Sequence, residues 1–175
     1  MSIRPHHEAV PAELEMQKDP VMSWVLKPRA LNIVWGNDPR YWKMPVGKED
    51  PAELLQVCWL EVTGSINDPQ MVKGKTYEIS FEVEMKEDAF GWNGSSVFML
   101  AKAGKRGTYK GQKITLSDNK DGNRKRITID KRFEVQNDNH DNTLYFGLYE
   151  VWSGRWKGGL LIYQAKVSQT SSNHN

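Results

Sequence analysis

Two tryptophans and a tyrosine fall in one short stretch of the chain that joins a strand to a turn. Residues 34–42 read VWGNDPRYW, with Trp35 before the Asn-Asp-Pro turn and with Tyr41 and Trp42 after it. Turn residues of this kind place a chain at the surface, so the sequence predicts large aromatic side chains within reach of water. Exposed aromatic area is costly unless a ligand covers it, and the apolar face of a sugar ring is one such ligand. The pattern therefore indicates a carbohydrate-binding site.

A carboxylate and two cations lie close together near the C-terminal end. Glu150 has the parity of the apolar residues in the predicted strand 143–152, which is apolar on both faces. A carboxylate in such a strand needs donors, because burying it alone is costly. Two interpretations stay open: an ion pair with Arg155 or Lys157, or acceptance of a hydroxyl or amide N–H from a bound sugar.

The aromatic candidates also have purely structural interpretations. Trp35 has the parity of Leu31 and Ile33 and can cap a buried strand, whereas Trp42 can pack under its own loop. Trp156 enters the last predicted strand, where packing is its alternative role.

Trp92 lies in a Gly-Trp-Asn-Gly loop and is either an extension of a binding groove or an anchor for that loop. Trp59 alternates with Val57 in an apolar segment, and we expect it and its neighbour Cys58 to be buried. Burial of Cys58 would argue against a third alternative, a structural or filament-forming component linked by an intermolecular disulfide.

Composition indicates one soluble domain. The chain has 175 residues, 24 basic and 22 acidic, with a net charge of +2. That length supports one core, and that charge does not by itself require a polyanionic partner. The single cysteine excludes an internal disulfide and favours a reducing compartment. No signal-like or membrane-spanning apolar run is present, so we expect a cytoplasmic protein that does not bind membranes.

Periodicity predicts an all-β fold. Residues 77–85 alternate apolar and polar side chains, as an antiparallel strand with one wet face requires. Short apolar segments punctuated by Gly, Pro, Asn and Asp favour a β-sandwich, jelly roll or barrel. The further predicted strands are 22–27, 30–35, 54–63, 97–101, 113–116, 126–129, 143–152 and 160–167. Very little helix is expected, with one candidate turn at 49–53 where Asp50 would cap and Pro51 would begin it. We expect residues 1–22 and 169–175 to be flexible extensions of a domain at 23–168.

Several motifs, in order along the chain, resemble the phloem protein 2 superfamily of plant lectins, which includes the tobacco Nictaba-type lectins. They are RALNIVWG at 29–36, PRYW at 39–42, LQVCWLEV at 55–62, YEV at 149–151 and WKGGL at 156–160. The resemblance spans about 23–167 and is greatest to the short cucurbit phloem lectins. It implies a jelly-roll β-sandwich that binds N-acetylglucosamine oligomers and the chitobiose core of N-glycans on glycoproteins. It also implies a homodimer without metal or cofactor, in the cytoplasm of phloem sieve elements and companion cells, with a role in transport or defence.

The resemblance adds weight to particular residues. The family's tryptophan matching Trp35 and its glutamate matching Glu150 have been implicated in sugar binding. The full set of predicted contacts is Trp35, Tyr41, Trp42, Trp92, Glu150, Trp156 and Lys157.

Other chemistries have weaker signals. Glu150 with Glu61 or Glu82 could form the carboxylate pair of a glycosidase, but no spacing singles out a pair. No metal-ligand cluster or nucleophilic triad is evident, and His140 lies alone in a polar loop, so no enzyme or metal site is predicted.

RNA is the alternative partner. Residues 102–132 hold eleven basic and three acidic residues, with Tyr109 available for stacking on a base. The ordinary interpretation of such a charge run is a solvated face.

Overall fold

The computed structural model describes residues 4–18, 21–118, 122–136 and 141–170, apart from the side chains of residues 125, 126 and 129–131. Two three-residue 3-10 helices, η1 (Pro11–Glu13) and η2 (Pro28–Ala30), are the helical elements of these residues. The strands are β1 (Leu14–Gln17), β2 (Ser23–Leu26), β3 (Asn32–Ile33), β4 (Trp42–Lys43), β5 (Ala52–Leu54), β6 (Leu60–Asn67), β7 (Thr76–Phe90), β8 (Val97–Ala103), β9 (Lys110–Ile114), β10 (Lys125–Glu134), β11 (Thr143–Glu150) and β12 (Gly158–Gln169).

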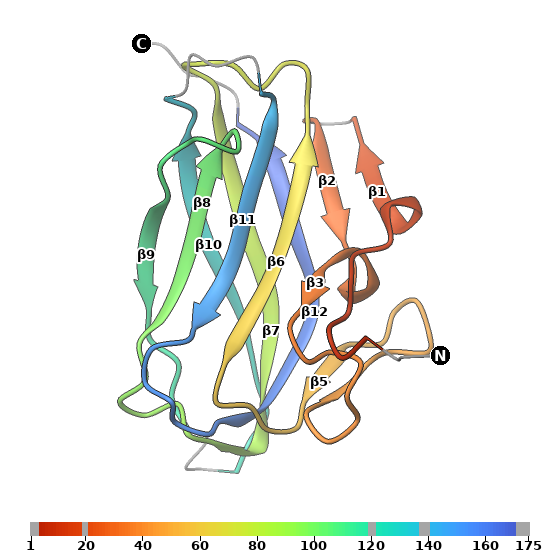
Figure 1. Ribbon diagram of the computed structural model, residues 1–175, viewed down its shortest axis with the longest axis vertical. Helices are drawn as coiled ribbons and strands as arrows, with labels where there is room; N and C mark the ends of the chain where they lie inside the picture. Colours follow the sequence, from red (N-terminus) through yellow and green to blue (C-terminus); the bar gives the residue numbers. More distant parts are fainter. Residues whose placement is uncertain (1–3, 19–20, 119–121, 137–140, 171–175) are drawn as a thin grey trace.

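The strands form two antiparallel sheets that pack face to face (Figure 1). One sheet has the order β3-β6-β11-β8-β9 and faces the viewer in Figure 1. In the other sheet, β12 is central: it pairs with β7 on one side and with β2 and β5 on the other. Beyond these strands, β10 pairs with β7, β1 pairs with β2, and β4 pairs with β5. The orders β2-β12-β7-β10 and β6-β11-β8-β9 are those of a jelly roll, so the predicted all-β sandwich with very little helix is confirmed.

Alternation of buried and half-buried residues makes the core. Along β7, Tyr77, Ile79, Phe81 and Val83 are buried, as predicted from the period of two. The facing strand β11 buries its own apolar set, and the rings of Phe81 and Phe146 meet edge to face at 5.9 Å between the sheets.

Two local predictions were wrong. Residues 49–53 do not begin a helix, because Ala52 and Leu54 alternate into the core as strand β5. The predicted strand 54–63 is two strands, β5 and β6, joined by a loop at 55–59 in which the chain crosses from one sheet to the other. Trp59 lies in this crossover and is 44% exposed, so it is not a core residue, and Cys58 is half-buried rather than buried.

The N-terminal segment is attached to the sandwich over more of its length than expected. Strand β1 pairs with β2 from Leu14↔Leu26 to Gln17↔Ser23. His7 exchanges two backbone hydrogen bonds with Ile33. The sheet therefore begins before residue 23, the predicted start of the domain. At the other end, β12 reaches Gln169, and residues 171–175 lie outside the described residues.

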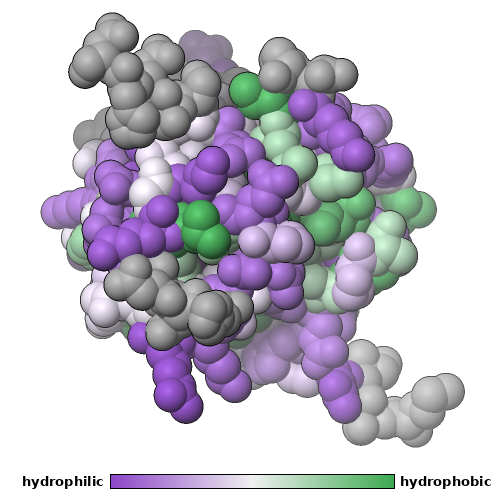
Figure 2. All heavy atoms as spheres, turned by 90° about the horizontal axis from the view of Figure 1, so that it is seen from above, coloured by the Kyte–Doolittle hydropathy of each residue, from purple (hydrophilic) through white to green (hydrophobic). Residues whose placement is uncertain are grey.

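The surface seen from the end at which β12 finishes is mostly hydrophilic, with apolar residues gathered towards one side (Figure 2). No helix among the described residues is long and apolar enough to cross a membrane.

Candidate functional site

The turn after β3 holds its aromatic side chains by a dense set of hydrogen bonds. Trp35 has φ of +66°, a left-handed conformation that non-glycine residues seldom adopt, and its N–H donates to His6 Nδ1 at 2.9 Å. The Asp38 carboxylate accepts from the backbone N–H of Arg40 at 3.0 Å and pairs with the Arg40 guanidinium at 2.7 Å. Hydrogen bonds from Arg40 hold the pKa of the Asp38 carboxyl below its usual value. These hydrogen bonds restrict the turn to one conformation.

Three partly exposed aromatic rings form a row beside this turn. The Tyr41 ring lies at its centre, 5.6 Å from Trp35 and 6.3 Å from Trp156 between ring centroids. Tyr41 and Trp35 are half-buried, and Trp156 is 50% exposed. The structure thus brings three of the predicted residues together from segments more than 100 positions apart in the sequence. We call Trp35, Tyr41 and Trp156 the aromatic row.

Trp42 does not belong to the row's surface. Its side chain is only 2% exposed, so the prediction that its ring face is presented to solvent is wrong. Strand β4 pairs with β5, and this turns Trp42 into the core. Trp42 nevertheless lines a hollow of about 410 Å³ next to the turn, and its indole N–H has no hydrogen-bond partner among the described residues. The other residues lining the hollow are Gly36, Asn37, Pro39, Lys43, Met44 and Leu55.

Glu150 and Lys157 form a buried ion pair directly behind the row. The Glu150 Oε2 lies 2.5 Å from Lys157 Nζ, and the two side chains are 1% and 0% exposed. The Ser153 N–H and hydroxyl donate to the same carboxylate at 3.1 Å and 2.9 Å. Burial alone would raise the Glu150 pKa, but the hydrogen bonds from Lys157 and Ser153 hold it below its usual value. Of the two interpretations from the sequence, the ion pair with Lys157 is the one the geometry supports.

The ion pair fixes the position of Trp156. Lys157 exchanges two backbone hydrogen bonds with Val57, and its ammonium also donates to the Arg155 carbonyl at 2.8 Å. Trp156 lies between Arg155 and Lys157 in the chain. Its ring is therefore held at the surface by its neighbour Lys157, which is entirely buried.

Trp92 lies apart from the row. It is 1% exposed, and its indole N–H donates to the Gly158 carbonyl at 2.9 Å while its backbone N–H donates to Asp118. Trp92 therefore anchors the loop between β7 and β8, which was the structural alternative, and its ring face cannot extend a groove.

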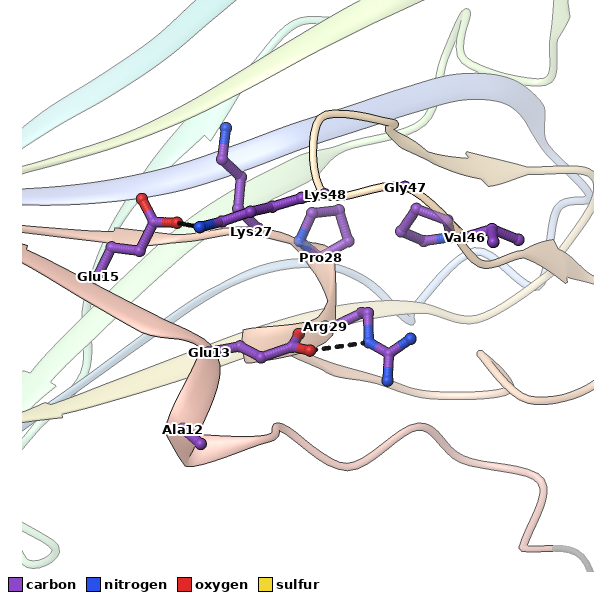
Figure 3. Close-up of a pocket in the computed structure, with 10 residues that line it drawn as sticks. Ala12, Glu13, Glu15, Lys27, Pro28, Arg29, Val46, Gly47 and Lys48 are labelled. Carbon is purple, nitrogen blue, oxygen red and sulfur yellow. Dashed lines mark ion pairs between the residues drawn. The ribbon is translucent and has the colours of Figure 1, made fainter.

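A second hollow, of about 320 Å³, lies between the N-terminal segment and the 45–48 loop (Figure 3). Its charged side chains already pair with one another: Arg29 with Glu13 at 3.2 Å and Lys48 with Glu15 at 2.8 Å. Figure 3 shows Glu15 and Lys48 meeting from opposite walls. The first pair ties η2 to η1 and the second ties the 45–48 loop to β1, so the charges that line this hollow hold the N-terminal segment in place.

The sequence missed two side chains near the row. His6, assigned to a flexible end, packs its ring 4.9 Å from that of Trp35. Trp59, assigned to the core, is exposed in the loop whose Val57 pairs with Lys157. Neither had a local signal, because both placements follow from contacts between distant segments. His140 lies outside the described residues. Within the described parts of the chain, no three His, Cys, Asp or Glu side chains gather as a metal site would need.

Comparison with known proteins identifies the family of this jelly-roll sandwich. A family model described as Phloem protein 2 matches residues 22–168, and the chain belongs to this family. The chain is 43% identical to the protein Phloem Protein 2-Like A9 of Arabidopsis thaliana over 94% of its own length and 96% of that protein. It is 28% identical to Phloem Protein 2-Like A1 of the same plant, over 79% of this chain and 58% of that one. It is also 38% identical to a lectin of Luffa acutangula, over 39% of this chain and 35% of that protein.

The buried pair predicts a specific stability defect. Lys157→Met should lower the free energy of unfolding by about 3–5 kcal/mol, because it leaves the Glu150 carboxylate buried without its cation. The double variant Glu150→Leu/Lys157→Met removes both charges and should recover most of the loss. Urea denaturation of the two variants measures this, and equal defects in both would contradict it.

The same pair predicts a pH dependence. The Glu150 pKa is lower in the folded protein than its ordinary value of 4.5, so its stabilising contribution is complete above that pH. The contribution is lost as the pH falls through the folded-state pKa. Thermal unfolding between neutral and acid pH should therefore show a shallower loss of stability in Glu150→Gln than in the unmodified protein.

Proposed function

We propose that the chain is a lectin that binds N-acetylglucosamine oligomers along the aromatic row, without catalysing a reaction. One observation carries the proposal: the partly exposed rings of Trp35, Tyr41 and Trp156 lie next to one another beside the rigid 34–41 turn. Aromatic faces attract the C–H side of a pyranose by dispersion. Three rings spaced about 6 Å apart suit a ligand longer than one sugar.

The hollow next to the row offers a reason for N-acetyl sugars. The buried Trp42 N–H has no acceptor among the described residues, and a buried unpaired donor costs about 1–3 kcal/mol. The Trp42 Nε1 atom is buried, so an acetamido carbonyl oxygen entering the hollow would accept this hydrogen bond only after the side chains that cover the nitrogen move aside; a hydroxyl on the same carbon is shorter and would not reach as far. Glu150 and Lys157 act in this proposal as the support of Trp156, since their charges are already paired.

Family membership supports the proposal. Relatives from Luffa acutangula and Coccinia grandis are named lectins. We extend the proposal to the chitobiose core of N-glycosylated proteins as a ligand, and to a role in phloem transport or defence in the cytoplasm of sieve elements and companion cells. A shallow site of this kind binds one sugar near millimolar, about −4 kcal/mol, and gains affinity by engaging several units.

Removing one ring of the row should weaken binding without unfolding the protein. We expect Trp156→Ala and Tyr41→Ala each to reduce the affinity for chitotriose by roughly 5–10-fold, because each removes one stacking contact. Isothermal titration calorimetry measures this.

Trp152→Ala is the matched control, because Trp152 is 60% exposed and packs on Phe98, outside the row. Its affinity should equal that of the unmodified protein. Full binding by both row variants would rule out the row as the sugar site.

Trp42→Phe separates the hollow from the row. Phenylalanine keeps most of the buried apolar volume but has no N–H, so we expect it to lose preference for chitotriose over cellotriose while keeping weak binding to both. Titration with the two trisaccharides measures the ratio, and an unchanged ratio would mean that Trp42 does not read the acetamido group.

RNA binding by the basic segment is the second candidate. Arg106 and Lys110 line a hollow of about 320 Å³ between the β8–β9 loop and the end of β10, and Lys102 lies 4.6 Å over the Tyr109 ring. Just before β10, the charge of Arg124 is already offset, since this residue pairs with Glu84 and Glu87. Among the described residues of the segment, the hollow is thus one place that offers cations to phosphate.

The two candidates differ in their response to salt. RNA binding should weaken steeply between about 50 and 200 mM salt and should fall further in Arg106→Ala. Chitotriose binding should hardly change with either. Fluorescence anisotropy with labelled single-stranded RNA at several salt concentrations tests this, and salt-independent or absent RNA binding would remove this candidate.

A further inference from the structure

The N-terminal residues 4–10 lie against β3 and the turn that follows it. Asn37, in that turn, donates three hydrogen bonds to the backbone of this segment. The acceptors are the carbonyls of Arg4, Pro5 and His6, at 3.1, 3.0 and 3.0 Å. A Cβ on Gly36 would come 2.8 Å from the Cβ of His7, so the two segments lie too close for a side chain at position 36. The N-terminal segment is therefore a fixed part of the turn's surroundings.

The left-handed backbone of Trp35 needs support, because a large side chain makes this conformation costly. The Trp35 carbonyl accepts from the Asp38 N–H at 3.1 Å, and the Trp35 N–H donates to His6 Nδ1 at 2.9 Å. The His6 ring also lies edge-on to the indole. Since the direction of a side chain depends on its own backbone torsions, the contact with His6 helps to set the orientation of the first ring of the aromatic row.

The contact with Trp35 also fixes which nitrogen of His6 carries hydrogen. Nδ1 accepts an N–H only with its lone pair free, so the neutral ring of His6 carries its hydrogen on Nε2. A second proton would go to Nδ1 and would face the Trp35 N–H. Two donors cannot bond each other, so protonation of His6 removes this support from Trp35.

The neighbouring His7 responds to acid in a different way. Its Nδ1 lies 2.9 Å from the Leu31 carbonyl, so this nitrogen carries the hydrogen and donates. A second proton would go to Nε2 and would leave that bond intact. Burial also lowers the pKa of His7 below its ordinary value.

The charged groups on the elements around His6 are mostly paired. The pairs are Arg4 with Glu8, Arg29 with Glu13, Asp38 with Arg40, and Glu150 with Lys157. Glu61, on the adjacent strand β6, lies opposite Tyr149. Hydrogen bonds from Arg40 lower the pKa of Asp38, and at Glu150 burial would raise the pKa but the hydrogen bonds from Lys157 and Ser153 lower it. Both carboxylates therefore keep their charge at mildly acid pH.

We propose that His6 is a positioning residue of the sugar site: its Nδ1 lone pair holds Trp35 in the left-handed conformation, and acid weakens sugar binding by protonating that nitrogen. This inference rests on the proposed function, because it concerns the first ring of the aromatic row. It requires no contact between His6 and the sugar.

Two substitutions separate the acceptor of His6 from its ring. His6→Phe keeps a ring beside Trp35 but has no acceptor, and it should lower the chitotriose affinity by roughly 3–5-fold at neutral pH. His6→Asn has no ring but places an oxygen where Nδ1 lies, so it should recover affinity to within about twofold of the unmodified protein. Isothermal titration calorimetry measures both. Full binding by His6→Phe with weak binding by His6→Asn would overturn the proposal and make the ring itself a sugar contact.

Acid should act on these proteins differently. Histidine ordinarily gains its proton between about pH 8 and pH 5, so the unmodified protein should lose roughly 3–5-fold in chitotriose affinity over that range. His6→Asn should lose less than about twofold, because its amide oxygen does not titrate there. His7→Asn is the matched control: its amide can still donate to the Leu31 carbonyl, and it should keep the full pH dependence. Equal pH dependence in the unmodified protein and in His6→Asn would contradict the proposal.

The backbone amide of Trp35 reports the same contact without any sugar. At one neutral pH, its hydrogen should exchange with water at least about threefold faster in His6→Phe than in the unmodified protein, with His6→Asn close to the latter. Nuclear magnetic resonance measures the exchange, and thermal unfolding checks that each variant is folded. Equal exchange in all three proteins would overturn the proposal. Exchange as expected in a protein that binds no chitotriose would remove the proposed function, and the hold of His6 on Trp35 would stand.

Discussion

The buried ion pair between Glu150 and Lys157 is the contact on which the candidate sugar site depends. It joins the end of β11 to the start of β12 where the chain passes from the five-stranded to the seven-stranded sheet. Two charges removed from water must satisfy each other, and here Ser153 and the Arg155 carbonyl complete their hydrogen bonds. The short loop between them then has little freedom, and Trp156 is held beside Tyr41 with half of its surface exposed.

Aromatic side chains gather on two separate surfaces of the sandwich. The aromatic row lies at the 34–41 turn, and its three rings are partly exposed to solvent. This arrangement suits a ligand that places one apolar face against the rings. The outer face of the five-stranded sheet carries a second group of aromatic side chains, the half-buried Phe98, Tyr145 and Tyr149. Both surfaces depend on the jelly-roll order, because the order decides which strands are neighbours and which loops meet.

Much of the fold was predictable from the sequence. The alternation in residues 77–85 gave strand, face and burial correctly, since a strand with one buried face has only one pattern that satisfies it. The crossover at residues 55–59 was not predictable, because Val57, Cys58 and Trp59 form an apolar run that suits a buried strand equally well. Only the pairing of Val57 with Lys157 ends the strand there and turns Trp59 to solvent. Strand β1 was missed because its alternation Leu-Glu-Met-Gln covers only four residues and buries little surface, so the pairing with β2 is what makes it a strand.

The sequence by itself determined which residue types could form the site: tryptophans, a tyrosine beside a turn, and a carboxylate in an apolar strand. It also determined that Glu150 needs hydrogen-bond donors or a cation, because the cost of burying a lone carboxylate does not depend on the details of the fold. Only the tertiary structure decided which tryptophans reach solvent. Trp35 and Trp156 do and Trp42 and Trp92 do not, since exposure depends on what packs over each ring, and the covering residues come from strands far away in the chain.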